Sequence, residues 1–193
     1  MNKSSQLSSW WEGSRSGDVE AFKCIHNELF PGLFHYLLKI LKDEDVCYDL
    51  LQDLFIKLWE KKEKLGPISN VKVYFFKSAR SIAINYIKSH KVRYAHTIQD
   101  FEIEMVFSQE EILVNREINL QMKRQLSIAL NGLPKRQREM IFLKYFDGWN
   151  YEQIAEVTGI KYQSVVNHVH RGILQLRTEL SEDKYMADCR VAV

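Results

Sequence analysis

Residues 149–177 read WNYEQIAEVTGIKYQSVVNHVHRGILQLR, and this stretch predicts two short helices joined by a tight turn. Asn150 is followed three residues later by Gln153, the pattern of a capping box. Gly159 stands where the turn needs a positive φ. In the second helix, apolar residues recur at helical spacing and form one buried stripe: Val165, Val169, Ile173 and Leu176. We therefore predict a helix-turn-helix, which commonly places its second helix in the major groove of DNA.

The opposite face of this second helix is polar. At about 100° per residue, Gln163, Asn167 and Arg171 fall opposite the apolar stripe, and Ser164 and His170 flank them. Such side chains can hydrogen-bond to base edges or phosphates. The alternative is the solvated face of an ordinary helical hairpin, and the cap, the central glycine and the basic residues before the pair favour DNA.

Composition indicates a globular chain with an uneven charge. A length of 193 residues is enough for one domain or two small ones. The composition, 46% hydrophobic and 27% charged, is that of a globular protein. The net charge is only +2, but residues 92–118 carry 2 Lys and Arg against 6 Asp and Glu, whereas residues 119–177 carry 9 against 4. Residues 1–91 carry 14 against 11, so an acidic strip separates two basic blocks, which favours a modular DNA binder with an acidic linker.

Several classes of protein are disfavoured. The three cysteines are widely spaced and lack zinc-ligand spacing, which predicts a reduced, intracellular protein. The N-terminus is polar and no apolar run approaches the roughly 18 residues of a membrane span, so we expect a cytoplasmic protein. His168 and His170 do not share a helix face, so we expect no metal. We also expect no cofactor and no catalytic residues, because neither a P-loop nor a nucleophile–base pattern is present.

The rest of the chain is predicted to be helical almost throughout. Each of the three prolines, at positions 31, 67 and 134, is expected to begin or break a helix. Helices are expected over residues 18–30, 33–41, 43–64, 71–93, 116–131 and 134–146. Residues 95–115 lose clear periodicity and become acidic. The sequence therefore predicts an all-α protein of two small helical domains, residues 17–94 and 116–178, joined by an acidic linker over residues 95–115.

The predicted helix over residues 71–93 is strongly basic. It contains six basic residues and no acidic one, and aromatic side chains lie between them. A basic stripe with interleaved aromatics suits single-stranded DNA, whose phosphates it neutralises and whose bases stack on the rings. We expect Phe75 and Tyr86 to belong to the core. For Tyr74 and Phe76, which lie off the core stripe, both core packing and base stacking remain open.

The predicted helix over residues 43–64 is acidic and amphipathic. Acids at its start complement the helix dipole, and four apolar residues can face a core: Leu51, Leu54, Phe55 and Leu58. Another side is formed by Asp49, Gln52, Asp53 and Ile56. An apolar residue in a polar row points to a surface that binds a partner helix, although a solvated charged face is the alternative.

Taken in order, these helices resemble the sigma factors of bacterial RNA polymerase, in the extracytoplasmic-function (ECF) subgroup of the sigma-70 family. The resemblance covers about residues 17–92 and 116–178. AFKCIHNELFPGLFHYLLKIL at 21–41 resembles region 2.1, and DLLQDLFIKLWEK at 49–61 resembles region 2.2. VYFFKSARSIAINYIKSHK at 73–91 resembles regions 2.3 and 2.4, and residues 133–177 resemble region 4. The four pieces are strongly specific because they occur together, in order and at this spacing.

The resemblance implies a mechanism and a set of partners. The protein would bind core RNA polymerase, gripping the clamp helices of the largest subunit and the flap of the second-largest, and bring it to promoter DNA. The loop over residues 65–71 would capture a flipped base of the −10 element. An anti-sigma partner is also expected, and the acidic linker would pass near the polymerase's active-site and RNA-exit channels. The residues implied for clamp binding are Asp49, Gln52, Asp53, Ile56 and Trp59; for the −10 element Lys72, Tyr74, Phe76, Lys77, Arg80, Asn85 and Lys88; and for the −35 element Gln163, Ser164, Asn167, His170 and Arg171.

The chain departs from the family pattern at three positions. Asn85 stands where the family usually has Asp, and Val166 and His168 stand where many members have Lys or Arg. One rival interpretation is a dimeric helix-turn-helix regulator with a ligand-sensing domain that is not part of the polymerase, but such a domain has no need of the basic stripe at 72–93. Another is an α-helical enzyme or adaptor with an exposed helical hairpin.

Overall fold

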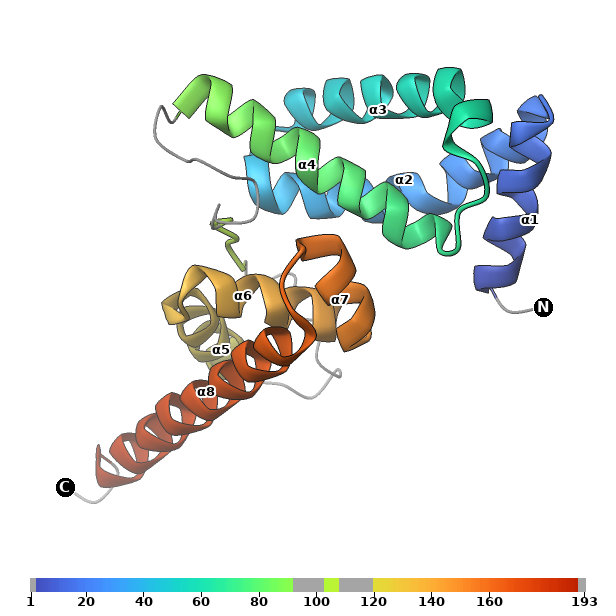
Figure 1. Ribbon diagram of the computed structural model, residues 1–193. Coiled ribbons are helices and arrows are strands. Elements are labelled where there is room, and N and C mark those ends of the chain that lie inside the picture. The colour runs from blue at the N-terminus through green and yellow to red at the C-terminus, as the bar shows by residue number, and fades with distance from the viewer. Residues whose placement is uncertain (1–2, 92–102, 108–119, 191–193) are drawn as a thin grey trace. The chain divides into compact units, whose positions relative to one another are not determined.

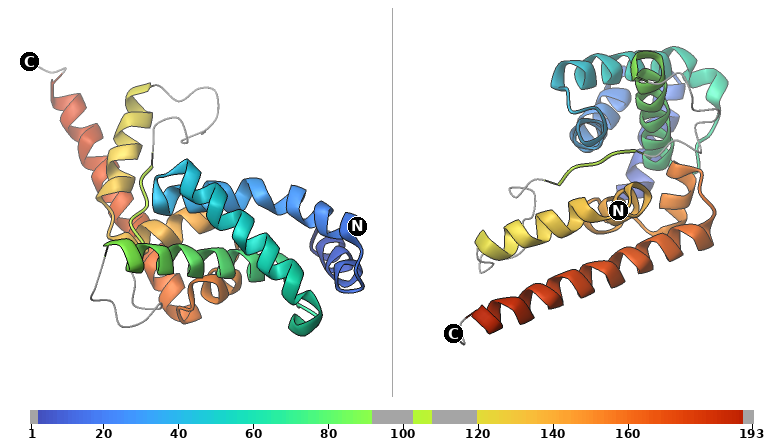
Figure 2. Two further views of the ribbon diagram at one scale, coloured as in Figure 1. Left: turned by 90° about the horizontal axis from the view of Figure 1, so that it is seen from above. Right: turned by 90° about the vertical axis from the view of Figure 1, so that its left-hand side faces the viewer.

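A computed structural model describes residues 3–91, 103–107 and 120–190 (Figures 1 and 2). Within these residues the secondary structure is entirely helical, which confirms the predicted all-α class. The chain divides into two compact units near residue 101, and each is described by itself. The helix α7 lies between η1 and α8 along the chain and is grouped with them. None of the described helices combines the length and the apolar character needed to cross a membrane.

The first unit contains α1 (Lys3–Arg15), α2 (Val19–Leu41), α3 (Glu44–Leu65) and α4 (Val71–Lys91). The last of these packs against the other three, and its Phe75 and Ala79 are fully buried. Each helix after the first begins at a side-chain cap. Asp18 accepts from two backbone N–H groups of α2, Asp43 accepts from one of α3, and Asn70 accepts from one of α4.

The predicted break at Pro31 is wrong, because α2 continues through it to Leu41. A proline inside a helix removes one hydrogen bond and costs about 3 kcal/mol. Pro31 and Asn27, whose carbonyl loses its donor, are both exposed, so water can solvate that carbonyl. Leu29 and Leu33 are buried on either side of the proline, and each is worth about 1.5–3 kcal/mol of burial. Tertiary packing therefore outweighs the local cost.

The helix α1 was not predicted, because its serine-rich sequence has a weak helical pattern. Packing explains it: Leu7 and Trp11 lie one turn apart, and both are buried. Gly13 allows a close approach to α2, since a Cβ built on it would lie 3.1 Å from the Cβ of Ala21. A helix that buries so few side chains depends on its neighbours for stability.

The second unit contains α5 (Leu120–Gly132), α6 (Lys135–Ile141), the π-helix η1 (Phe142–Phe146), α7 (Tyr151–Thr158) and α8 (Tyr162–Arg190). The predicted helix over 134–146 is present, but its last turn is widened and Asp147 N–H donates to the Phe142 carbonyl. The predicted start at residue 116 lies outside the described residues. The last helix packs against α5 and α6 and runs past residue 177. Its apolar stripe is confirmed, with Ile173 half-buried.

Residues 103–107, in the predicted linker, are docked on the second unit. Ile103, Met105 and Phe107 are buried, and the residues between them are exposed, the alternation of an extended chain. The Asn131 side chain accepts from Phe107 N–H and donates to the Phe107 carbonyl, both at 2.9 Å. Arg138 donates to the carbonyl of Met105. The other linker residues lie outside the described part of the chain.

Candidate DNA and polymerase interfaces

The capping box at the start of α7 and the turn between α7 and α8 have the geometry that the sequence predicted. Asn150 N–H donates to Gln153 Oε1 at 3.0 Å, and Gln153 N–H donates to Asn150 Oδ1 at 2.8 Å. This reciprocal pair is the capping box, and it fixes where α7 begins. Gly159 follows α7 with a φ of +73°, a backbone conformation that residues other than glycine rarely adopt. The start and the end of α7 are therefore marked by its own local sequence.

The polar face of α8 is exposed. Gln163, Asn167, His170 and Arg171 are all exposed, and Ser164 is half-buried. The amide of Gln163 donates to Asn167 Oδ1 at 3.2 Å, one turn further along. Two further neighbours, which the polar spacing alone does not indicate, lie at the start of α8.

Those two neighbours are Lys161 and Tyr162, which are exposed just where the helix begins. Tyr162 meets Tyr151 edge-on, with ring centroids 6.2 Å apart. Their position at the N-terminal end of the second helix could have identified them, because this end is the part that reaches bases in a helix-turn-helix. Val166 and His168, the departures from the family pattern, are half-buried.

The exposed face of α3 combines acidic and apolar side chains. Asp49, Gln52 and Asp53 are exposed, and Ile56 is 57% exposed although it is apolar. Asp53 lies 3.4 Å from the ammonium of Lys57, but both are exposed, so this pair adds little stability. The predicted inward side is confirmed, because the four apolar residues assigned to it are buried.

Two aromatic residues border the exposed face of α3. Trp59 is half-buried, and the centroid of its ring lies 5.2 Å from that of Phe22. The ammonium group of Lys62 lies 3.8 Å from the Trp59 ring centroid. Tyr48 is 45% exposed and was missed by the sequence analysis. It stands one turn before Gln52 and two turns before Ile56, and this spacing could have identified it.

The candidate DNA-binding residues of α4 are not all accessible. Lys77 and Asn85 are exposed, and Lys72, Tyr74 and Lys88 are half-buried. Phe76 is 2% exposed and packs on Tyr36 with ring centroids 5.6 Å apart, so its ring belongs to the core rather than to a base-stacking surface. Arg80 is also 2% exposed, and a phosphate contact would require its side chain to move. In both cases the helical pattern alone could not distinguish a core position from a surface one.

Within the described residues, no three His, Cys, Asp or Glu side chains are grouped so that they could hold a metal ion. The described residues offer several surfaces for binding. These surfaces are an exposed polar helix face after a tight turn, a basic helix face, and an acidic face with an exposed isoleucine.

Two family models match the chain. The model for "Sigma-70 region 2" matches residues 25–93, and the model for "Sigma-70, region 4" matches residues 123–176. The ECF RNA polymerase sigma factor SigX of Bacillus subtilis (strain 168) is 23% identical over 173 residues, which cover 88% of this chain and 89% of SigX. SigM of the same organism, also an ECF sigma factor, is 27% identical over 136 residues, covering 70% of this chain and 80% of SigM.

Two solved structures share the fold. One chain of the co-crystal structure of the sigma factor RpoE with the anti-sigma factor NepR from Bartonella quintana superimposes with a TM-score of 0.59 at 23% identity, covering 84% of this chain and 98% of that one. A chain of the structure of CnrH with the cytosolic domain of CnrY gives a TM-score of 0.61 at 17% identity, covering 92% and 99%. Together with the two family models, these findings show that the chain belongs to the sigma-70 family of RNA polymerase sigma factors, in its ECF group.

Proposed function

We propose that this sigma factor binds core RNA polymerase and directs it to promoters that carry −10 and −35 elements, without catalysing a reaction itself. The proposed −10 module spans residues 17–94, the proposed −35 module spans residues 116–178, and the linker spans residues 95–115. The observation that carries the proposal is the exposed polar row of α8, formed by Gln163, Asn167 and Arg171. This row follows a helix capped by Asn150 and a turn at Gly159 with a positive φ, as in a helix-turn-helix. Because core polymerase is intracellular, we place the protein in the cytoplasm.

In the −35 module, the N-terminal half of α8 would enter the major groove. Gln163 and Asn167 carry amides, which can pair with the N6 and N7 edge of adenine. Arg171 lies one turn beyond Asn167 and would reach a guanine edge or a phosphate, while Ser164 and His170 flank the row. Since Gln163 already donates to Asn167, one of the two amides is oriented before DNA arrives.

In the −10 module, exposed Lys77 and half-buried Lys88 would hold phosphates of the non-template strand, with Lys72, Tyr74 and Asn85 nearer the bases. We leave out Phe76 and Arg80, because both are buried. The loop over residues 65–71 precedes this helix and would capture a flipped base, by analogy with the family.

The exposed face of α3 would bind the clamp helices of the largest polymerase subunit. The exposed polar residues Asp49, Gln52 and Asp53 would provide charge and hydrogen bonds. Ile56 would provide an apolar anchor, which is exposed to solvent in the free protein, and Trp59 borders the face. An anchor of this kind gains free energy when a partner covers it. The −35 module would also contact the flap of the second-largest subunit. We further propose an anti-sigma partner, the kind of protein with which RpoE was crystallised.

Two substitutions separate the proposed interfaces. Arg171→Ala should weaken binding to a duplex −35 element by about ten-fold, because one good side-chain contact to a base is worth about 1–3 kcal/mol. It should leave core binding unchanged. Arg177→Ala, an exposed arginine on the same helix outside the row, is the matched control. The duplex is one that wild-type holoenzyme selects from a randomised pool.

Asp53→Ala should do the reverse, weakening core binding while leaving DNA binding by the assembled holoenzyme intact. Glu63→Ala, which removes another exposed acid of α3 outside the proposed face, is its control. Equal losses for Arg171→Ala and Arg177→Ala, or for the two acid substitutions, would show that only general charge matters and would refute the assignments.

A further inference from the structure

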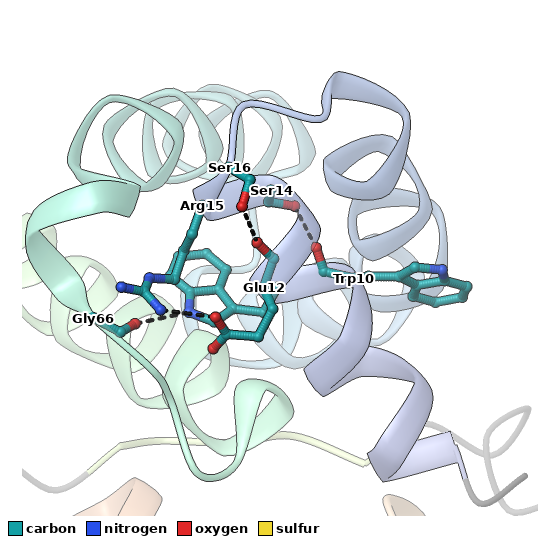
Figure 3. Close-up of polar contacts among 7 residues, drawn as sticks. Trp10, Glu12, Ser14, Arg15, Ser16 and Gly66 are labelled. Carbon is teal, nitrogen blue, oxygen red and sulfur yellow. Dashed lines mark hydrogen bonds and ion pairs between the residues drawn. The ribbon is translucent and has the colours of Figure 1, made fainter.

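The helix α1 has no assigned role, and it lies before the residues matched by the family model for region 2. Its Trp11 is fully buried. The indole Nε1–H of Trp11 donates to the carbonyl of Gly66 at 3.0 Å, across 55 positions of sequence (Figure 3). The indole also meets Phe75 of α4 edge-on, with ring centroids 6.2 Å apart. One side chain therefore connects α1 to both the loop that precedes α4 and the helix itself.

This loop is fixed at both ends. Gly66 ends α3 with φ +68° and ψ −167°, and its carbonyl accepts from Trp11. At the other end, the Asn70 side chain accepts from the backbone N–H of Val73, and Val71 is buried. Only residues 67–69 lie between the two fixed ends, and Pro67 and Ser69 among them are exposed. The loop thus presents a short exposed tip on an anchored base.

The helix that carries Trp11 is itself held in place. Its Gly13 approaches α2 closely, and the Gly13 carbonyl accepts from the backbone N–H of Asp18 at 3.1 Å. Trp10, the adjacent residue, is only half-buried, and Figure 3 shows its ring directed away from Gly66. The two neighbouring tryptophans therefore differ in what they contact, which provides an internal control.

We propose that Trp11 is a positioning residue for promoter-strand binding, which presets the loop tip by holding the Gly66 carbonyl. The proposal rests on the proposed function, in which this loop captures a base of the −10 element. A loop that is ordered before DNA arrives loses less conformational entropy on binding, so the bound state is favoured. Trp11 would touch no nucleotide itself and would act only through the loop.

The test uses holoenzyme assembled from core polymerase and the full-length protein. The probe is a fluorescent single-stranded oligonucleotide that carries the −10 sequence selected by wild-type holoenzyme from a randomised pool, and a scrambled strand of equal composition accompanies it. Trp11→Phe keeps an aromatic ring and removes the N–H donor. We expect it to weaken binding of the −10 strand by about five-fold, the effect of losing one hydrogen bond. Binding of the scrambled strand and of core polymerase should not change.

Two further variants define the outcome. Trp10→Phe should leave all three affinities unchanged. Gly66→Ala keeps Trp11 but strains the positive φ, so it should reproduce the selective loss even if Trp11→Phe does not fold. The proposal is overturned if these variants bind the −10 strand normally, or if they weaken both strands and core binding equally. If wild-type holoenzyme selects no −10 sequence, the proposed function fails first, and the proposal fails with it.

Discussion

Replacing Asn131 with alanine should release residues 103–107 from the second unit. The Asn131 side chain makes two hydrogen bonds to the backbone of Phe107, one as acceptor and one as donor, both at 2.9 Å. Each contributes about 1 kcal/mol net, so their loss should cost about 2 kcal/mol, which is about 30-fold in the docking equilibrium. One support remains at this residue, because Ser127 Oγ also donates to the Phe107 carbonyl.

Amide hydrogen exchange measures this change at the residue concerned. In Asn131→Ala, exchange of the Phe107 amide should accelerate by about 30-fold, because exchange follows the opening equilibrium. Asn167→Ala, which removes an exposed asparagine of the same unit, should leave that exchange rate unchanged. An unchanged rate at Phe107 in Asn131→Ala, or the same acceleration throughout α5–α8, would refute the reasoning, since the second result would mean global rather than local destabilisation.

Three other changes have defined outcomes. Asn150→Ala removes the cap of α7 and should lower the free energy of unfolding by about 1 kcal/mol in urea titrations. Gly172→Ala places a Cβ 3.2 Å from the Ile141 side chain of α6 and should lower the thermal midpoint, whereas Gly132→Ala, whose Cβ would meet the Glu179 carboxylate at an ordinary contact distance of 3.9 Å, should not. Burial raises the pKa of the Cys47 thiol from 9.0 to about 11, with Asp43 adding to the effect. Because the unfolded thiol ionises first, stability should fall between pH 9 and 11, and this component should be missing in Cys47→Ala.

Periodicity and caps were enough to predict most helices. The helices beginning after Asp18 and Asp43 and the capped pair at 149–177 all carry strong local signals, and the structure has them. The sequence misled at Pro31 because the local cost of a proline is visible in the sequence, whereas the burial on both sides of it depends on partners far along the chain. Tertiary packing also explains α1, which no local pattern predicts.

The exposure of the candidate site residues could be predicted from the sequence on α8 but only in part on α4. The exposed face of α8 follows from spacing opposite a clear apolar stripe, so Gln163 and Asn167 lie on the surface as expected. On α4 the same argument was insufficient, because that helix is covered by three others and more of its circumference is buried. Phe76 and Arg80 are buried for this reason. The docking of Phe107 involves two hydrogen bonds with the Asn131 side chain and one from Ser127 Oγ, and such bonds leave no periodic pattern in the sequence.

Promoter-specific transcription in a reconstituted system tests the central claim most directly. Core RNA polymerase, the full-length protein and fragmented genomic DNA would be combined, and the 5′ ends of the transcripts mapped. We predict discrete start sites that core polymerase alone does not give, and that disappear when residues 17–92 are deleted. Start sites that persist after this deletion, or transcripts that do not depend on the protein at all, would contradict the account.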